Sequence, residues 1–183
     1  MNHIIHTWSL LDKCYYHCSR LQCVNQKEQN VFRVRLLTYR GQNLSLSDGT
    51  IIQSQDLLLK IHLHNCMLIK EMQGMDHDVK RALYVHNRVE RSLPGLAQFV
   101  FNHPERDRIK GILGITLLSR GVKRLGFDSL DIPNPIYKRI KALYLIPMFC
   151  VCHHNLKLNS FKKENLTPKY LAMSKEILLD RFL

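Results

Sequence analysis

The 183-residue sequence has little that would mark a membrane-spanning or secreted protein. Its longest apolar run, Ala142–Cys152, contains Pro147 and is far shorter than the roughly 20 residues that a membrane helix needs. The start of the chain lacks both the basic segment and the unbroken apolar core of a signal peptide. We therefore expect a cytoplasmic protein with no transmembrane segment, whose six cysteines are free thiols.

The sequence also lacks the short motifs by which many enzymes and metalloproteins are recognised. It has no Cys-x-x-Cys pair of a zinc module, no P-loop and no Gly-x-Gly-x-x-Gly. No arrangement of Ser, His and Asp, or of Cys and His, matches a known catalytic motif, and no RRM, KH or helix-turn-helix signature is present. We therefore expect no metal, no cofactor and no specific nucleic acid. Whether the protein is an enzyme stays open.

Acidic residues are scarce beside basic ones. Lys and Arg number 27 against 15 Asp and Glu, which gives a formal net charge of +12. Such a charge favours an anionic partner, either a small molecule, a polymer or a membrane surface. Because the basic residues are scattered, a solvated basic surface is the simpler interpretation. A weak association with an anionic membrane through Tyr144–Val151 and flanking lysines is a further alternative.

The clearest local patterns lie in residues 43–72. Asp48-Gly49 between two β-prone runs predicts a hairpin with a two-residue loop, because both residue types tolerate positive φ. Leu57–His64 alternates apolar and polar residues, which predicts a half-buried strand with Leu58, Lys60, His62 and His64 on one face. Asn65 is a candidate N-cap for the helix that follows.

The remaining elements complete an α+β pattern. We expect a helix over residues 3–22 and a strand over Val31–Tyr39, which with the hairpin and Leu57–His64 forms an antiparallel meander of about four strands. A helix capped by Asp76 should break at Ser92 and Pro94 and restart as a second helix.

Residues 108–132 predict a compact strand–helix–strand unit, in which Thr116 caps the helix and Gly126 ends it. The C-terminal part predicts a helix over Pro135–Phe149, a strand over Lys169–Met173 and a last helix capped by Ser174. The whole chain, 1–183, is thus expected to be one α+β domain. Its sheet should be mixed but mainly antiparallel, with about six strands and packed helices.

Two histidines on one strand face form the leading candidate site. His62 and His64 are about 6.6 Å apart along a strand, and Lys60 and Asn65 could hold a substrate anion beside them. We expect this face to border a pocket. A metal site there would need a third ligand, such as Glu71, Asp76 or His77. The alternative is a polar sheet face on which the histidines are inert.

Two other groups of residues give weaker signals. Thr116 and Arg120, with Ser119 and Arg124, lie on or beside the predicted helix after a glycine-bearing strand, where an anion could bind; alternatively these arginines are only solvated. The cysteines could supply soft metal ligands, but their spacing fits no zinc module. For them, a role as small hydrophobic residues is the simpler interpretation. The soft ligands in question are Cys14, Cys18, Cys23, Cys150, Cys152, His153 and His154.

Three stretches of the chain resemble one protein family. FRVRLLTYRG followed by LSDGTIIQSQDLLLKIHLHN, then GITLLSRGVKRLGF, and finally TPKYLAMSKEILLDRF are similar to the YkoP-like family of Bacillus and its relatives. The resemblance covers nearly the whole chain. It implies no catalytic residues, but similar domains occur behind polysaccharide deacetylase domains. The resemblance thus implies a role in envelope polysaccharide metabolism. We therefore expect a ligand-binding or accessory domain that serves it and recognises an anionic small molecule or sugar derivative at the end of the strand that carries His62 and His64.

A fainter resemblance concerns residues 108–132 alone. Their strand, their helix ending in Arg-Leu-Gly-Phe and their second strand are similar to the close of Gcn5-type acetyltransferase domains. Such enzymes hold coenzyme A on a glycine-containing loop, which here should lie near residues 64–80, and its sequence pattern is absent. An acetyltransferase-related enzyme with a degenerate or non-standard coenzyme A site is therefore the alternative function.

Overall fold

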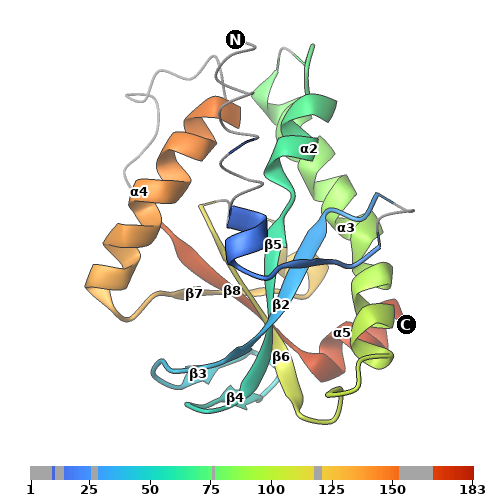
Figure 1. The fold of residues 1–183 in the computed structure, drawn as a ribbon, viewed down its shortest axis with the longest axis vertical. Helices are drawn as coiled ribbons and strands as arrows, with labels where there is room; N and C mark the ends of the chain where they lie inside the picture. The colour runs from blue at the N-terminus through green and yellow to red at the C-terminus, as the bar shows by residue number, and fades with distance from the viewer. Residues whose placement is uncertain (1–9, 11–14, 26–28, 76, 118–120, 153–166) are drawn as a thin grey trace.

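The fold is centred on one six-stranded sheet (Figure 1). The computed structural model describes residues 10, 15–25, 29–75, 77–117, 121–152 and 167–183. Across the sheet the strands follow the order β1 (Gln22–Cys23), β2 (Phe32–Thr38), β5 (Leu57–Leu63), β6 (Ile109–Thr116), β8 (Lys169–Ser174) and β7 (Asp128–Asp131).

Only one neighbouring pair in this sheet is parallel. β5 runs parallel to β6, and every other pair is antiparallel. The last strand, β8, lies between β6 and β7, so these two parallel strands do not touch. The predicted α+β class, with a mixed and mainly antiparallel sheet of about six strands, is confirmed. The prediction of a single domain over 1–183 stays a prediction.

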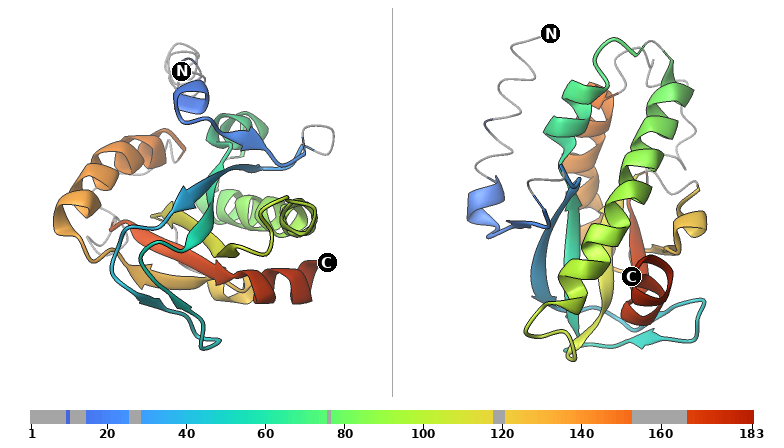
Figure 2. Two further views of the ribbon diagram at one scale, coloured as in Figure 1. Left: turned by 60° about the horizontal axis from the view of Figure 1, so that its bottom comes forward. Right: turned by 90° about the vertical axis from the view of Figure 1, so that its right-hand side faces the viewer.

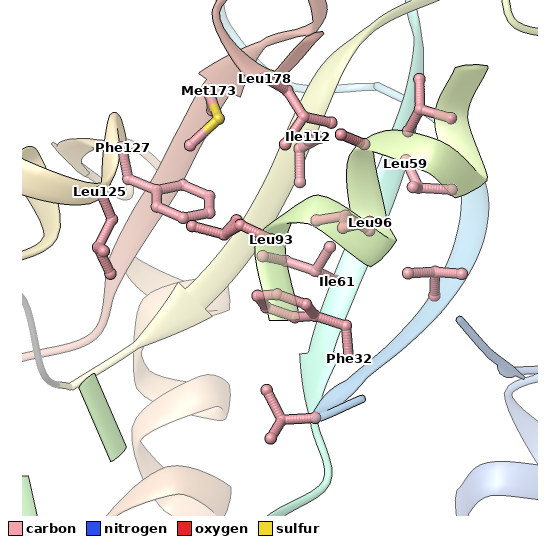
Figure 3. Packing of buried hydrophobic residues seen from close by; sticks show 14 of the residues in the cluster. Phe32, Leu59, Ile61, Leu93, Leu96, Ile112, Leu125, Phe127, Met173 and Leu178 are labelled. Atoms are coloured by element: carbon pink, nitrogen blue, oxygen red, sulfur yellow. The ribbon is translucent and has the colours of Figure 1, made fainter. Parts of the chain in front are cut away.

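Helices cover both faces of the sheet (Figure 2). One face packs against α2 (Asn65–Glu71), α3 (Asp78–Phe101) and α5 (Lys175–Phe182). Figure 3 shows the side chains that fill this core, with Phe32, Leu59 and Ile61 of the sheet against Leu93 and Leu96 of α3. The helix α4 (Pro135–Cys152) lies on the opposite face. Within the described ranges, no helix is both long and apolar enough to cross a membrane.

The hairpin β3–β4 differs from its prediction in two ways. Its strands, β3 (Leu44–Ser45) and β4 (Ile51–Ile52), form a separate two-stranded sheet, and β2 pairs directly with β5. Its loop is longer than two residues, because Leu46 N–H bonds to the Thr50 carbonyl and Gly49 N–H to the Leu46 carbonyl. Gly49 has a φ of 87°, as the turn requires. Leu44 and Ile52 thereby reach the second sheet face and become buried there.

The predicted break at Ser92 and Pro94 was wrong, because α3 is continuous through Pro94. This part of the helix instead holds the loop before β2. Asn30 Nδ2 donates to the Ser92 carbonyl at 2.9 Å, and Val31 N–H donates to Ser92 Oγ at 3.2 Å. A Cβ at Gly95 would lie 2.6 Å from Asn30 Nδ2, so any other residue there would displace the Asn30 side chain from its bond to Ser92. The apparent breakers are therefore packing residues.

Three further predictions about helices need correction. The predicted helix after Thr116 is, in its described part, a 3₁₀ turn, η1 (Val122–Leu125), although Gly126 ends it with a φ of 89° as expected. The N-cap of α2 is His64 rather than Asn65. Gln22 belongs to β1, so the predicted helix over 3–22 ends earlier. Asp76 and most of the residues before Tyr15 lie outside the described residues.

The last helix begins as predicted. Ser174 is its N-cap, and its hydroxyl accepts a hydrogen bond from Ile177 N–H at 3.1 Å. The Ser174 side chain is buried, so water cannot replace that bond. We expect Ser174→Ala to lower the free energy of unfolding by about 1 kcal/mol, measured by urea denaturation.

Ser129→Ala is the matched control for that change. The Ser129 hydroxyl is buried and has no hydrogen-bond partner in the described part of the chain. Its removal should therefore leave the unfolding midpoint nearly unchanged. Equal losses in the two variants would contradict the role assigned to Ser174.

Candidate functional site

Two cross-strand pairs gather four basic side chains on one face of the sheet. In the antiparallel ladder of β2 and β5, Arg33 lies opposite His62 and Arg35 lies opposite Lys60. The two pairs are two residues apart on each strand, so all four side chains share a face. Directly opposed residues have Cβ atoms about 5 Å apart. With Lys141 of α4, these residues are called the cationic face below.

The cationic face lies where the parallel pair of strands separates. The ladder between β5 and β6 has its last pair at Lys60 and Leu113, whereas β5 continues to Leu63 and β6 to Thr116 (Figure 1). Lys60 is thus at the point of separation, and His62 lies beyond it. In open sheets with parallel strands, ligands bind outside the carboxyl ends of the strands at such points.

Aromatic rings and α4 cover the cationic face. Tyr15 packs edge-on against His62 with ring centroids 5.6 Å apart, and Tyr144 of α4 stacks on Tyr15 at 5.9 Å. The Arg33 guanidinium lies 4.8 Å from the centre of the Tyr16 ring. Such contacts stabilise a cation without neutralising its charge.

Lys141 approaches the cationic face from α4. Its ammonium lies 5.1 Å from the ring centre of Tyr137, one turn earlier on the helix. Its positive charge also lowers the pKa of Lys60 and of His62, although burial is the larger cause for both. The helix therefore adds a fifth basic group above the two cross-strand pairs.

The other half of the same sheet face is apolar. Leu58, two residues before Lys60, is fully buried with Tyr39 and Tyr170, and Leu44 and Ile52 of the hairpin close this cluster. Tyr137 of α4 packs against its edge. The cationic face therefore borders an apolar cluster that excludes water. The low dielectric constant of such a cluster strengthens electrostatic interactions on the cationic face.

Lys60 and Arg35 of the cationic face have no acidic counterpart among the described residues. The ion pairs among the described residues join Glu71, Glu105, Asp107 and Asp131 to basic residues that do not belong to the cationic face. Lys60 is only 6% exposed and makes no hydrogen bond or ion pair within the described ranges. Arg35 Nε and His62 Nε2 are buried and also lack a hydrogen-bond partner there. Buried polar groups in proteins nearly always have partners, so this arrangement is unusual.

Burial and mutual repulsion change the protonation of this group. The pKa of Lys60 falls from 10.5 to about 8, chiefly through desolvation and then through Lys141 and Arg35. The pKa of His62 falls to about 3, again through desolvation first and then through neighbouring cations, of which Lys60 contributes most. His62 is consequently a neutral imidazole at physiological pH, and Lys60 is close to losing its proton.

The predicted site residues fall into three groups. Lys60 and His62 lie together on the cationic face. His64, Asn65 and Thr116 lie where the parallel strands end: His64 caps α2, Asn65 is the first residue of that helix, and Thr116 ends β6. Arg120 and Ser119 lie outside the described residues. For the residues of all three groups, a role in ligand binding stays a prediction.

The sequence interpretation missed Arg33, Arg35 and Lys141 as members of this site. The sequence shows that Arg33 and Arg35 are two residues apart on one strand. The expected meander, however, placed the hairpin between that strand and the strand of Lys60, so the two arginines were not expected beside Lys60. Lys141 lies on a helix whose docking position no local pattern reveals. The fact that β2 and Leu57–His64 both carry basic residues two apart was the available signal.

The expected pocket beside His62 stays a prediction. A cavity of about 250 Å³ opens near the edge of β2, where β1 ends, and Ser19, Arg20, Phe99 and His103 contribute to its lining. Arg35 also lines it, whereas Lys60 and His62 do not. Val34, Leu59 and Phe99, which belong to the core on the α3 side of the sheet, line the cavity as well.

No metal site emerges from the residues that the structure describes. No group of three His, Cys, Asp or Glu side chains there could hold one ion. Glu71, suggested as a third ligand, instead pairs with Arg88 at 3.1 Å and accepts a bond from Tyr84. Cys18, Cys23 and Cys66 form no disulfide among the described residues. The other cysteines named as candidate ligands, together with His153 and His154, lie in residues whose side chains the structure does not describe.

Comparison with known sequences identifies the family. The sequence model of the YkoP domain matches residues 1–182. The chain belongs to the YkoP domain family. It is 39% identical over 171 residues to a Bacillus subtilis (strain 168) protein called "Uncharacterized protein YkoP", which covers 93% of this chain and 91% of the relative. No solved structure matches, so the suggested likeness to acetyltransferases stays a prediction.

The buried charge of Lys60 gives a stability prediction for this YkoP-family protein. Because its pKa is about 8 when folded and 10.5 when unfolded, the folded state bears the cost of a buried ammonium below pH 8. That cost disappears as the pH rises from 8 to 10.5, since the folded state then releases its proton first. We expect Lys60→Met to raise the free energy of unfolding at pH 7 by about 2 kcal/mol, and by much less at pH 10.

Urea denaturation at both pH values measures this difference. Lys110→Met is the matched control, because Lys110 lies on the adjacent strand β6 with an exposed side chain. That variant should change stability little at either pH. A destabilised Lys60→Met protein at pH 7 would show that Lys60 has a stabilising partner.

Proposed function

We propose that this YkoP-family protein binds an anionic small molecule or sugar derivative on its cationic face. The observation that carries the proposal is the pairing of Arg35 with Lys60 beneath α4, with no acidic residue described beside either of these two, next to the pair of Arg33 and His62. A phosphate or carboxylate group is the partner that such a group of cations binds best.

The energetic argument concerns the unliganded protein. Like charges directly opposite each other on a sheet destabilise it, and a buried ammonium without a partner costs several kcal/mol more. A protein that only needed a stable sheet could carry apolar residues here, as it does at Leu58 on the same face. A bound anion would offset both costs, and the pKa of Lys60 would then return toward its ordinary value.

The surroundings favour a ligand with an apolar or ring-shaped part beside its charge. Tyr15, Tyr137 and Tyr144 present aromatic rings around the cationic face. Ligand sites in proteins typically combine such surfaces with a few placed polar groups. The family resemblance adds envelope polysaccharide metabolism as the proposed context, with the protein as a ligand-binding or accessory domain in the cytoplasm. Sugar phosphates and nucleotide sugars are therefore the first ligands to test.

A thermal-shift screen tests the binding. We expect glucose 6-phosphate or uridine diphosphate N-acetylglucosamine to raise the melting temperature, since a ligand at one hundred times its Kd adds about 2.7 kcal/mol. Arg35→Met and Lys60→Met should abolish the shift, whereas Lys110→Met should keep it. Calorimetry near pH 8 in two buffers of different ionisation enthalpy should show proton uptake on binding, because the anion raises the pKa of Lys60.

Potassium chloride at matched ionic strength is the control for general screening by salt. Equal stabilisation by chloride, or equal loss in the Lys110→Met variant, would contradict a specific site. Stabilisation by acetyl-coenzyme A, with acetyl transfer detected, would instead support an acetyltransferase-related enzyme.

A second candidate function is weak association with an anionic membrane surface. The outer side of α4 exposes a stripe of apolar side chains: Ile136 is 69% exposed, Ile140 56% and Leu143 77%. Arg139 is exposed beside this stripe, and an amphipathic helix of this kind binds through apolar burial and electrostatic attraction.

Vesicle sedimentation tests this candidate. We expect more protein to sediment with vesicles of phosphatidylserine and phosphatidylcholine than with phosphatidylcholine alone, and Leu143→Gln should lower that fraction several-fold. Leu183→Gln is the matched control, because Leu183 is similarly exposed at the end of the chain. Equal sedimentation with both vesicle types would count against this function.

A further inference from the structure

Lys60 has a property that anion binding alone does not require. Arg33 and Arg35 already place two permanently charged groups on the cationic face, because a guanidinium stays protonated in proteins. Lys141 adds a further ammonium from α4. Lys60 is the most buried of these basic groups, and it lies directly opposite Arg35. A group placed in this way is the one that most readily releases its proton.

A lysine that loses its proton becomes a nucleophile. Enzymes activate lysines for Schiff-base chemistry by desolvating them or by placing a second cation beside them. Both conditions hold at Lys60, since it is 6% exposed, has Arg35 across the strand and is coupled to Lys141 above. The same cations can hold the acidic group of a substrate close to the amine.

We propose that Lys60 forms an imine with the carbonyl carbon of an oxo acid whose carboxylate is held by Arg35 and Lys141. This inference rests on the proposed anion-binding function and adds the chemical class of the ligand. The cross-strand position of Arg35 sets the spacing. Its Cβ lies about 5 Å from that of Lys60, so both side chains leave the same face of the sheet from neighbouring positions, and the charge of Arg35 acts on both Lys60 and Lys141.

The reaction balances without an oxidant or a reductant. The neutral Lys60 Nζ attacks the carbonyl carbon, a carbon–nitrogen bond forms as the carbonyl π bond breaks, and one of the two amine protons moves to the carbonyl oxygen. The resulting carbinolamine loses its hydroxyl group and the amine proton as one molecule of water, which leaves a carbon–nitrogen double bond. A proton taken up at that nitrogen gives an iminium, which replaces the lysine ammonium as the cation beside the bound carboxylate.

The walls of the site favour this product. Leu58 and the cluster around Tyr170 border the cationic face on one side, and Tyr137 lies below Lys141 on the other. A site poor in water favours loss of water from the carbinolamine and protects the imine from hydrolysis. An arginine at position 60 would bind the carboxylate equally well but could not form the imine. The variant Lys60→Arg therefore separates carboxylate binding from imine formation.

Reductive trapping with pyruvate tests the proposal. The full-length protein is incubated with pyruvate and sodium cyanoborohydride at pH 7, and peptide mass spectrometry measures the adduct on each lysine. Because the pKa of Lys60 is about 8, its neutral fraction at pH 7 should exceed that of a lysine with the usual pKa of about 10.4 on the order of 100-fold. We expect Lys60 to be labelled faster than Lys110 by at least about ten-fold, which allows for its lower exposure.

Three comparisons distinguish the imine from general labelling. Acetone, which has the carbonyl but no carboxylate, should label Lys60 much more slowly than pyruvate does. Inorganic phosphate should protect Lys60 and leave Lys110 unaffected. Lys60→Arg should abolish the major adduct while phosphate still raises its melting temperature. The first two comparisons use the unmodified protein and stand even where a variant fails to fold.

The outcomes separate this inference from the function on which it rests. Labelling of Lys60 no faster than Lys110, while sugar phosphates still stabilise the protein, would overturn the imine and leave anion binding intact. Labelling by acetone as fast as by pyruvate would overturn the carboxylate site. Loss of both the labelling and the anion-induced shift would overturn both proposals.

Discussion

The structure depends most on the ladder between β2 and β5. This pairing joins the N-terminal part of the chain to the parallel strands, and it sets Arg35 against Lys60 and Arg33 against His62. The ladder bonds themselves are ordinary backbone interactions and are indifferent to side-chain charge. The repulsion among the basic groups is therefore a cost that the pairing tolerates. It is tolerated because the opposite face of the same two strands packs Val34, Leu59 and Ile61 into the main core.

One sheet face serves two purposes along its length. Near the β3–β4 hairpin it is a closed apolar cluster around Leu58 and Tyr170, in which burial raises the pKa of Tyr170. Two residues further along β5, the same face carries Lys60 under α4. The apolar half anchors the hairpin and the edge of α4, so the position of Lys141 above Lys60 does not depend on favourable charge contacts. A stable scaffold thus holds an electrostatically unfavourable group of side chains, as functional sites in proteins commonly do.

Local patterns predicted individual elements well and their partners poorly. The alternation in Leu57–His64 correctly placed Lys60 and His62 on one face, and Ser174 was correctly placed as a helix cap. The expected meander failed because chain proximity does not decide strand pairing: the hairpin is too short to bury both of its faces within the main sheet. Pro94 was misread because local propensity ignores tertiary contacts, here those between Asn30 and Ser92.

The sequence by itself determined the α+β class, the family, the excess of basic residues and the identity of two residues at the candidate site. The family follows from similarity to known sequences, and the other features follow from composition, periodicity and short-range spacing, which are properties of a chain read in one dimension. Only the tertiary structure decided that Arg33, Arg35 and Lys141 join Lys60 and that both sheet faces are covered. The physical reason is that pKa shifts and unpaired charges arise from burial and from neighbours distant in the chain, and no local pattern contains either.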